Sequence, residues 1–289
     1  MYGVIRLGKT ACMCISLGAA ALGVMVFGAI ERGRASAQTA AADSRELPVL
    51  MYHSVVNDSS LVGDYVITAE QLEADFIYLR DSGYTPVFCK ELPDFTEGTG
   101  DLPEKPIVLT FDDGSYNNFY YVLPLLEKYG FKAVFAPVGE WTEAAAAEES
   151  PSPVYSYMDE ENIRSCALSG LVEIADHTYS LHSIGEREGV LRRADESPEG
   201  YRRMLWSDLD RSRRIIEQAC GELPVTLAYP YGFCSDESEQ LARELGYKVT
   251  LGCEEKTNII TRGDADCLSR LHRFNRSAGR NAESFLSSD

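Results

Sequence analysis

The chain of 289 residues is 45% hydrophobic and 25% charged, which allows one large hydrophobic core or two modest ones. Its formal net charge of −18 repels phosphate backbones and therefore argues against nucleic acid as a partner. The acidity does not choose among neutral substrates.

The N-terminal segment has the pattern of a membrane anchor. Arg6 and Lys9 precede twenty uncharged residues at 11–30. Twenty helical residues span about 30 Å, the thickness of the hydrocarbon core of a bilayer. We therefore expect a cytoplasmic N-terminus at 1–10, a transmembrane signal-anchor at 11–30 and a polar linker at 31–46.

A cleaved signal peptide is the alternative for this segment. The stretch Ala35-Ser36-Ala37 is similar to a signal-peptidase site, although the apolar run is longer than the ~7–15 residues of a usual signal core. In the first case the rest of the chain is a single-pass membrane protein with an extracytoplasmic domain. In the second case it is secreted.

From residue 47 onward, apolar strands alternate with helices. Thr68 and Gln71 have the spacing of a capping box, which predicts a helix that begins there and stops at Gly83. Further helices are predicted at 116–129, before Gly130, and at 235–245, before Gly246. Strands are predicted at 47–52, 106–111, 131–136, 171–175, 225–229 and 247–251. Such strands indicate a parallel sheet covered on both sides, as a barrel or a doubly wound sheet.

Polar residues of the types used in hydrolysis follow directly after four of these strands. They are His53, Asp112, Asp113, His177, His182 and Tyr231. In parallel barrels the C-terminal ends of the strands carry the chemistry, so we expect these side chains to converge. Taken singly, Asp-Asp-Gly is commonly a turn and a lone histidine is commonly structural. Their joint placement favours one site.

The residue types favour a hydrolytic metal site. Two imidazoles and one carboxylate leave positions open for water and substrate, and Asp113, His177 and His182 would be that set. Asp112 would then face the metal-activated water and take its proton. The cysteines include no C-x-x-C pair, which argues against a cysteine zinc site.

These residues resemble the motifs of a known family. The stretch TFDDG at 110–114 and the pattern H-T-x-x-x-H at 177–182 resemble the polysaccharide deacetylases of carbohydrate esterase family 4, which have a NodB-type domain. The stretch AYPYG at 228–232 is similar to their third motif. The resemblance covers about residues 47–274. It is closest to the branch that deacetylates poly-N-acetylglucosamine, because the chain has Met51-Tyr52-His53.

The resemblance implies an α/β fold, a distorted (β/α)7 barrel, for a single catalytic domain at 47–289. It implies that Asp112 is the general base and that the Tyr231 N–H holds the oxyanion. It implies one divalent metal ion, usually zinc, with the ligands Asp113, His177 and His182.

Two departures from the family pattern concern the catalytic groups. Ala228 occupies the place of an arginine that orients the base, and we expect Arg273 to supply that role from elsewhere. The late Leu-x-His motif that supplies the general acid is not present in its standard form. In the branch named above the N-terminal histidine takes this position, which makes His53 the expected acid.

The expected function is metal-dependent removal of N-acetyl groups from an N-acetylglucosamine-containing polysaccharide, with release of acetate. A non-catalytic carbohydrate-binding protein on the same fold is one alternative, because of the missing arginine. A glycoside hydrolase is another, but its two carboxyl groups stand ~5–9.5 Å apart on either side of the bond, and sequence neighbours are poorly placed for that.

Overall fold

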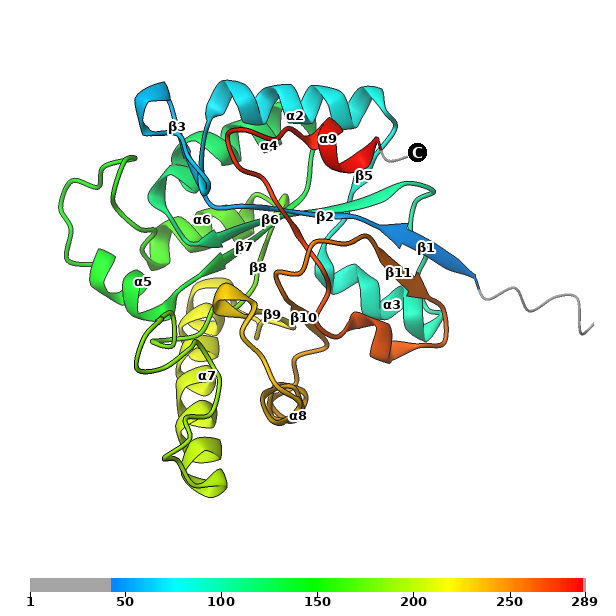
Figure 1. Cartoon of the computed structure of the whole chain (residues 1–289). Helices are drawn as coiled ribbons and strands as arrows, with labels where there is room; N and C mark the ends of the chain where they lie inside the picture. Colours follow the sequence, from blue (N-terminus) through cyan, green and yellow to red (C-terminus); the bar gives the residue numbers. More distant parts are fainter. Residues whose placement is uncertain (1–42, 288–289) are drawn as a thin grey trace, which may run out of the picture. The chain divides into compact units, whose positions relative to one another are not determined.

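The computed structural model describes residues 43–287 (Figure 1). The predicted segments at 1–10 and 11–30, and most of the linker, lie outside these residues. Strand β1 (Ser44–Leu47) begins the folded unit ahead of the predicted domain boundary at residue 47. No helix within 43–287 has the length and apolar character needed to cross a membrane.

The centre of this unit is a parallel sheet with the strand order β12-β2-β6-β7-β8 (Figure 1). The strands are β2 (Val49–Tyr52), β6 (Pro106–Asp113), β7 (Ala133–Pro137), β8 (Val172–Ile174) and β12 (Phe274–Asn275). Short β5 (Thr85–Pro86) pairs with the start of β6. The parallel α/β arrangement predicted from the apolar strands is confirmed.

A second parallel pair of strands is joined to this sheet at both of its edges. It consists of β9 (Thr226–Ala228) and β10 (Val249–Leu251). Isolated parallel bridges join Asp176 to Leu227 and Leu251 to Leu271. The first bridge connects β8 to β9, and the second connects β10 to the segment that leads into β12.

Alternate residues of the strands point into different cores, as the period of a strand requires. Leu109 and Phe111 of β6 pack with residues of the covering helices, in a cluster that includes Leu72 and Phe76. Val108 packs instead with Val249 of β10. Both faces of β6 are therefore buried, which explains why the strand is apolar throughout.

Helices cover the sheet and carry several expected end signals. The helices are α2 (Ala69–Asp81), α3 (Leu92–Glu97), α4 (Leu123–Tyr129), α5 (Gly139–Ala145), α6 (Glu160–Leu168), α7 (Pro198–Cys220), α8 (Asp236–Leu245) and α9 (Ala282–Leu286). The predicted capping box begins α2: the Gln71 N–H donates to Thr68 Oγ1 over 3.1 Å, and the Thr68 N–H donates to Gln71 Oε1 over 3.0 Å.

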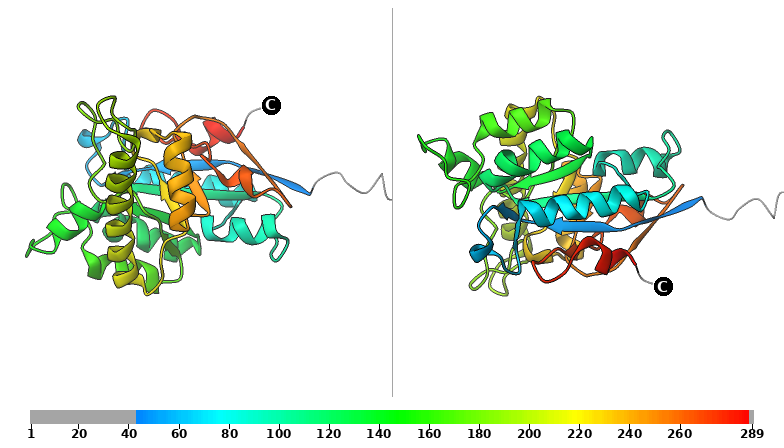
Figure 2. Two further views of the ribbon diagram at one scale, coloured as in Figure 1. Left: turned by 90° about the horizontal axis from the view of Figure 1, so that it is seen from below. Right: turned by 90° about the horizontal axis from the view of Figure 1, so that it is seen from above.

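Some elements differ from the sequence prediction. The predicted helix at 116–129 is a π-helical turn, η3 (Asn118–Val122), followed by α4. Helix α7 was not predicted, and it lies beside α8 (Figure 2), where Leu205 packs with Leu241.

The remaining elements are short: β3 (Ser54–Val56), β4 (Val66–Thr68), β11 (Asn258–Thr261), η1 (Ser59–Leu61), η2 (Cys89–Glu91), η4 (Pro230–Gly232) and η5 (Ala265–Leu268).

Candidate metal and active site

The polar residues predicted at the strand ends lie around one cavity of about 420 Å³. Asp113 ends β6, while His53 directly follows β2 and Tyr231 lies in η4, just beyond β9. The cavity is lined by Met51, His53, Tyr65, Asp112, Asp113, His177, His182, Tyr231, Cys253 and Asn275. All six residues singled out after the predicted strands are in this set.

Asp113, His177 and His182 fit a metal ion. Their ligand atoms all lie within 4.8 Å of one another. The His177 Nδ1–H donates to Ala228 O over 2.7 Å, which leaves a lone pair on His177 Nε2. Asp113 Oδ1 lies 3.6 Å from that Nε2 and 3.1 Å from His182 Nε2, yet it is buried and has no hydrogen-bond partner among residues 43–287. Lone pairs that converge in this way are stabilised by a cation, so the donor set fits a divalent metal.

The backbone around this cavity is strained at three non-glycine residues. Asp113, Thr178 and Tyr231 have positive φ angles of 71°, 69° and 58°. Left-handed conformations of this kind cost roughly 1–3 kcal/mol each and persist only where the surroundings over-determine them. In residues 43–287 only Arg270 is a further non-glycine case, so strain gathers at the candidate site.

Two buried aspartates hold the loop between His177 and His182. Asp176 accepts a hydrogen bond from the Thr178 N–H over 2.8 Å. Asp208, on α7, accepts from the N–H groups of Tyr179 and Ser180, both over 2.9 Å. The sequence reasoning missed Asp208. The sequence signal for Asp208 is a carboxylate on the buried face of the amphipathic helix α7, and that helix was not predicted.

Arg273 lies directly against Asp112. Its guanidinium is fully buried and donates from Nη1 to Asp112 Oδ1 over 2.8 Å and to Thr110 Oγ1 over 3.2 Å. Its Nε–H donates to Gly252 O over 2.7 Å. Burial by itself would raise the pKa of Asp112, but Arg273, followed by the nearby histidines, outweighs it and lowers that pKa to about 2. Asp112 is therefore a carboxylate near neutral pH.

The two candidate general acids lie in different places. His53 lines the cavity, and its Nδ1 is buried without a partner in the described part of the chain. Burial lowers the pKa of His53, while the carboxylates of Asp112 and Asp113 oppose that shift. His272 does not line the cavity, and its Nδ1 lies 3.6 Å from Glu254 Oε2.

Tyr231 lines the cavity from the turn η4. Its phenol oxygen lies 3.1 Å from His182 Nδ1. The preceding Pro230 has no N–H, so Tyr231 offers the first backbone donor of this turn. At the following Gly232, whose φ is +72°, an added Cβ would lie 2.8 Å from Cys253 Cβ. The tight approach of these two segments fixes the position of Tyr231.

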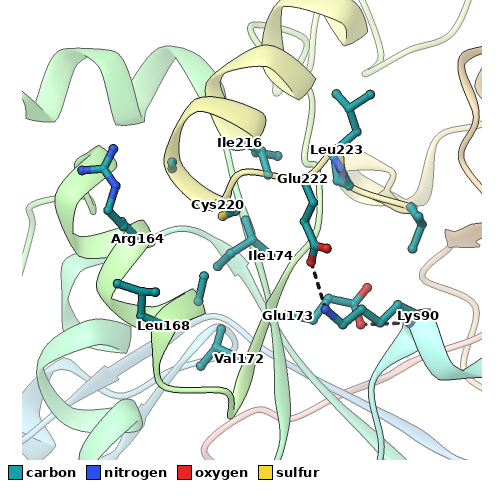
Figure 3. Close-up of a pocket in the computed structure, with 14 residues that line it drawn as sticks. Lys90, Arg164, Leu168, Val172, Glu173, Ile174, Ile216, Cys220, Glu222 and Leu223 are labelled. Carbon is teal, nitrogen blue, oxygen red and sulfur yellow. Dashed lines mark hydrogen bonds and ion pairs between the residues drawn. The ribbon is translucent and has the colours of Figure 1, made fainter.

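A second cavity, of about 180 Å³, lies where β8 and β9 begin (Figure 3). Its charged groups are already paired. Lys90 Nζ lies 3.0 Å from Glu222 Oε1, and Glu173 accepts hydrogen bonds from the Lys90 N–H and the Thr226 hydroxyl. It contains none of the predicted site residues. The strand ends at Asp113 and His177 are therefore the better candidate.

Comparisons with known proteins find similarity to deacetylases. Residues 99–250 match the family described as polysaccharide deacetylase. The chain is 29% identical over 243 residues to the poly-beta-1,6-N-acetyl-D-glucosamine N-deacetylase of Escherichia coli K12, covering 77% of this chain and 36% of that protein. The chain thus spans about a third of the length of this curated relative.

Two solved structures resemble the fold over most of its length. The de-N-acetylase from Aggregatibacter actinomycetemcomitans is 28% identical, with a TM-score of 0.72 over 83% of this chain and 98% of that one. IcaB from Ammonifex degensii is 25% identical, with a TM-score of 0.68 over 84% of this chain and 98% of that one. With the family match over more than half of its residues, this chain belongs to the polysaccharide deacetylase family.

Proposed function

We propose that this protein is a metal-dependent hydrolase that removes N-acetyl groups from an N-acetylglucosamine-containing polysaccharide and releases acetate. The observation that carries the proposal is the convergence of Asp113, His177 and His182 beside an Asp112 carboxylate held by Arg273. The names of the Escherichia coli and Aggregatibacter relatives, both de-N-acetylases, support the same reaction class.

The metal ligands in this proposal are Asp113, His177 and His182. Two imidazoles and one carboxylate favour zinc, although such a set accepts several divalent ions. A divalent ion bound there would polarise the acetamide carbonyl and lower the pKa of water. Asp208 and Asp176 hold the loop between the two histidines and so fix the positions of both side chains.

The remaining roles belong to side chains and backbone around the cavity. Asp112 accepts the proton of the attacking water, and Arg273 orients that carboxylate. The N–H of Tyr231 donates to the carbonyl oxygen as it becomes negative. His53 protonates the leaving nitrogen when the carbon–nitrogen bond breaks. The products are acetate and a free amino sugar.

We also propose the finer fold and topology expected from the family. The segments β2, β6, β7, β8, β9, β10 and β12 would close as a distorted (β/α)7 barrel, which the bridges Asp176–Leu227 and Leu251–Leu271 support. The uncharged residues 11–30 support a membrane anchor with an extracytoplasmic catalytic domain.

The test is acetate release from an N-acetylglucosamine oligomer. Chelation should abolish it and added zinc should restore it. Asp113→Ala should lose bound metal, measured by elemental analysis, whereas Asp112→Asn should keep metal and lose activity. Full activity in demonstrably metal-free protein would contradict the site. Binding without acetate release in the metal-loaded protein would favour the non-catalytic alternative, and shortened oligomers would indicate a glycoside hydrolase.

A further inference from the structure

We propose that Asp75 is a positioning residue for His53, acting through the hydroxyl of Tyr52 and the guanidinium of Arg276. The role rests on the proposed function, because it takes His53 as the acid that protonates the leaving nitrogen. The side chains of Tyr52, Asp75 and Arg276 form a buried network behind β2. That network fixes the backbone that carries the acid.

The imidazole of His53 is not held by a hydrogen bond at Nδ1. That atom is buried and has no hydrogen-bond partner among residues 43–287. The ring meets Tyr65 edge-on, with centroids 4.8 Å apart, a contact that supplies no hydrogen bond to Nδ1. A general acid has to lie within about 2.6–3.2 Å of the atom that it protonates. The direction of this ring therefore depends largely on the backbone at His53.

Tyr52, the residue before His53, anchors that backbone in the core. Successive residues of a strand point to opposite sides, so Tyr52 packs in the core cluster formed with α2 while His53 lines the cavity. The Tyr52 ring stacks on that of Phe111, its register partner in β6, with centroids 4.8 Å apart and planes at 13°. Phe111 precedes Asp112, so this contact joins the strand ends that carry the proposed acid and the proposed base.

Asp75, on α2, accepts hydrogen bonds from three residues of other segments. The Tyr52 hydroxyl donates to Asp75 Oδ2 over 3.2 Å, and the Arg276 Nε–H donates to the same oxygen over 2.7 Å. Asp75 Oδ1 accepts from Arg276 Nη2 over 3.3 Å and from the Ala282 N–H over 2.9 Å. The guanidinium of Arg276 supplies the opposite charge that a buried carboxylate needs. Asp75 is therefore held at one place, and it holds the Tyr52 hydroxyl there.

Arg276 connects the same carboxylate to the backbone of β2. The Arg276 N–H donates to Met51 O over 2.9 Å, and β12, just before Arg276, pairs in parallel with β2. Asp75 thus holds β2 at two points, through the side chain of Tyr52 and through the backbone of Met51. These are the two residues before His53, so a change at Asp75 reaches the acid first. A pair that only supported the fold would affect stability and leave the preference between substrates unchanged.

The test compares two substrates that differ in their need for an acid. Tyr52→Phe, which keeps the stacked ring and removes only the donor, and Asp75→Asn would be assayed on the N-acetylglucosamine hexamer and on 4-nitrophenyl acetate. Tyr201→Phe is the matched control, because Tyr201 is also buried and its hydroxyl donates to Val190 O over 2.7 Å, in a separate core cluster. Metal content and melting temperature of each variant show that it is folded and loaded.

We expect Tyr52→Phe to lower kcat for the hexamer by about tenfold, with KM and metal content unchanged. A misplacement of about 1 Å can cost about 10²-fold, and the loss of one hydrogen bond moves the ring by less. Asp75→Asn should lower kcat at least as much, because it also releases Arg276. Both variants should hydrolyse 4-nitrophenyl acetate within about twofold of the wild-type rate, since its leaving group needs little protonation. Tyr201→Phe should leave both rates unchanged.

Two results would overturn the role of Asp75. Equal falls of both activities in Tyr52→Phe would make the network a support of the fold alone, and unchanged activity on the hexamer would remove it from the reaction. Failure of the proposed function is seen separately, as no acetate release by the wild-type protein. In that event the NMR signal of the His53 imidazole, assigned by its loss in His53→Ala, decides. A shift in Tyr52→Phe but not in Tyr201→Phe supports the positioning, and an unmoved signal refutes it.

Discussion

At the residue scale, the neighbouring carboxylates of the Asp-Asp-Gly turn have different surroundings. Successive strand residues point to opposite sides, and Asp113 is additionally left-handed, with φ at 71°. Asp112 is therefore directed to the buried Arg273, while Asp113 Oδ1 faces His177 and His182. One carboxylate is paired with a cation of the protein, and the other is left for a metal.

The Arg273–Asp112 pair is testable by a double-mutant cycle. Arg273→Met leaves the Asp112 carboxylate buried without its partner, so we expect the free energy of unfolding to fall by roughly 3–5 kcal/mol. The double variant Asp112→Asn/Arg273→Met should be more stable than Arg273→Met alone. Chemical denaturation measures both. Arg80→Met is the control, because Arg80 and its partner Asp81 are both exposed, and it should change the stability far less. Additive effects of the two buried substitutions would contradict the pairing.

The general acid is the second prediction at this scale. His53→Ala should lower kcat by ~10²–10⁴, the usual contribution of a positioned acid, with metal content unchanged. His272→Ala should cost far less, because His272 does not line the cavity. An activated acetate ester needs little protonation of its leaving group and should partly rescue His53→Ala. Loss of metal from His53→Ala would make His53 a ligand, and an inactive His272→Ala beside an active His53→Ala would reverse the assignment.

At the scale of elements, the site depends on how strand β6 ends. Gly114 follows Asp113 with φ at +77°, and an added Cβ would lie 2.7 Å from Pro137 Cβ, at the end of the neighbouring β7. This turn therefore needs glycine for its backbone angle and also for the close approach of the two strands. The Asp-Gly sequence predicted a turn, but the contact with β7 arises only in the folded sheet.

The two requirements at Gly114 can be separated by a pair of variants. Gly130 also has a positive φ, +64°, but an added Cβ there would meet nothing within 4 Å. Gly130→Ala should therefore destabilise the protein by about 1 kcal/mol, the cost of placing a Cβ in the left-handed conformation alone. Gly114→Ala should cost clearly more and weaken metal binding, because Asp113 is displaced with the turn. Thermal unfolding and metal titration measure the difference, and equal losses in the two variants would refute the role of the Pro137 contact.

At the scale of the whole molecule, the placement of the chain in the cell is the open prediction. The uncharged residues 11–30 after Arg6 and Lys9 predict membrane-bound protein with an intact N-terminus and an outward catalytic domain. Fractionation of the producing cells, N-terminal sequencing and protease accessibility test this. Soluble secreted protein that begins at Gln38 would identify the segment as a cleaved signal instead.

Local patterns in the sequence determined most of the elements and the location of the site. Apolar runs predicted the strands, because both faces of a covered parallel sheet exclude water. Thr68 and Gln71 predicted the start of α2, since a capping box satisfies backbone donors within one helical turn. His177, which follows an apolar run, was placed at the candidate site because the ends of parallel strands meet at one edge.

The tertiary structure decided how distant residues complete that site. The family resemblance put Arg273 forward, and the fold pairs it with Asp112 across 161 positions of the chain. Asp208 reaches the loop after His177 from a helix that was not predicted. Asn275 Nδ2 likewise donates a hydrogen bond to Asp64 O, in the loop before Tyr65. Capping boxes and apolar periodicity operate within a turn or a strand. Contacts between remote segments depend instead on how the strands and helices pack, which no single stretch of sequence specifies.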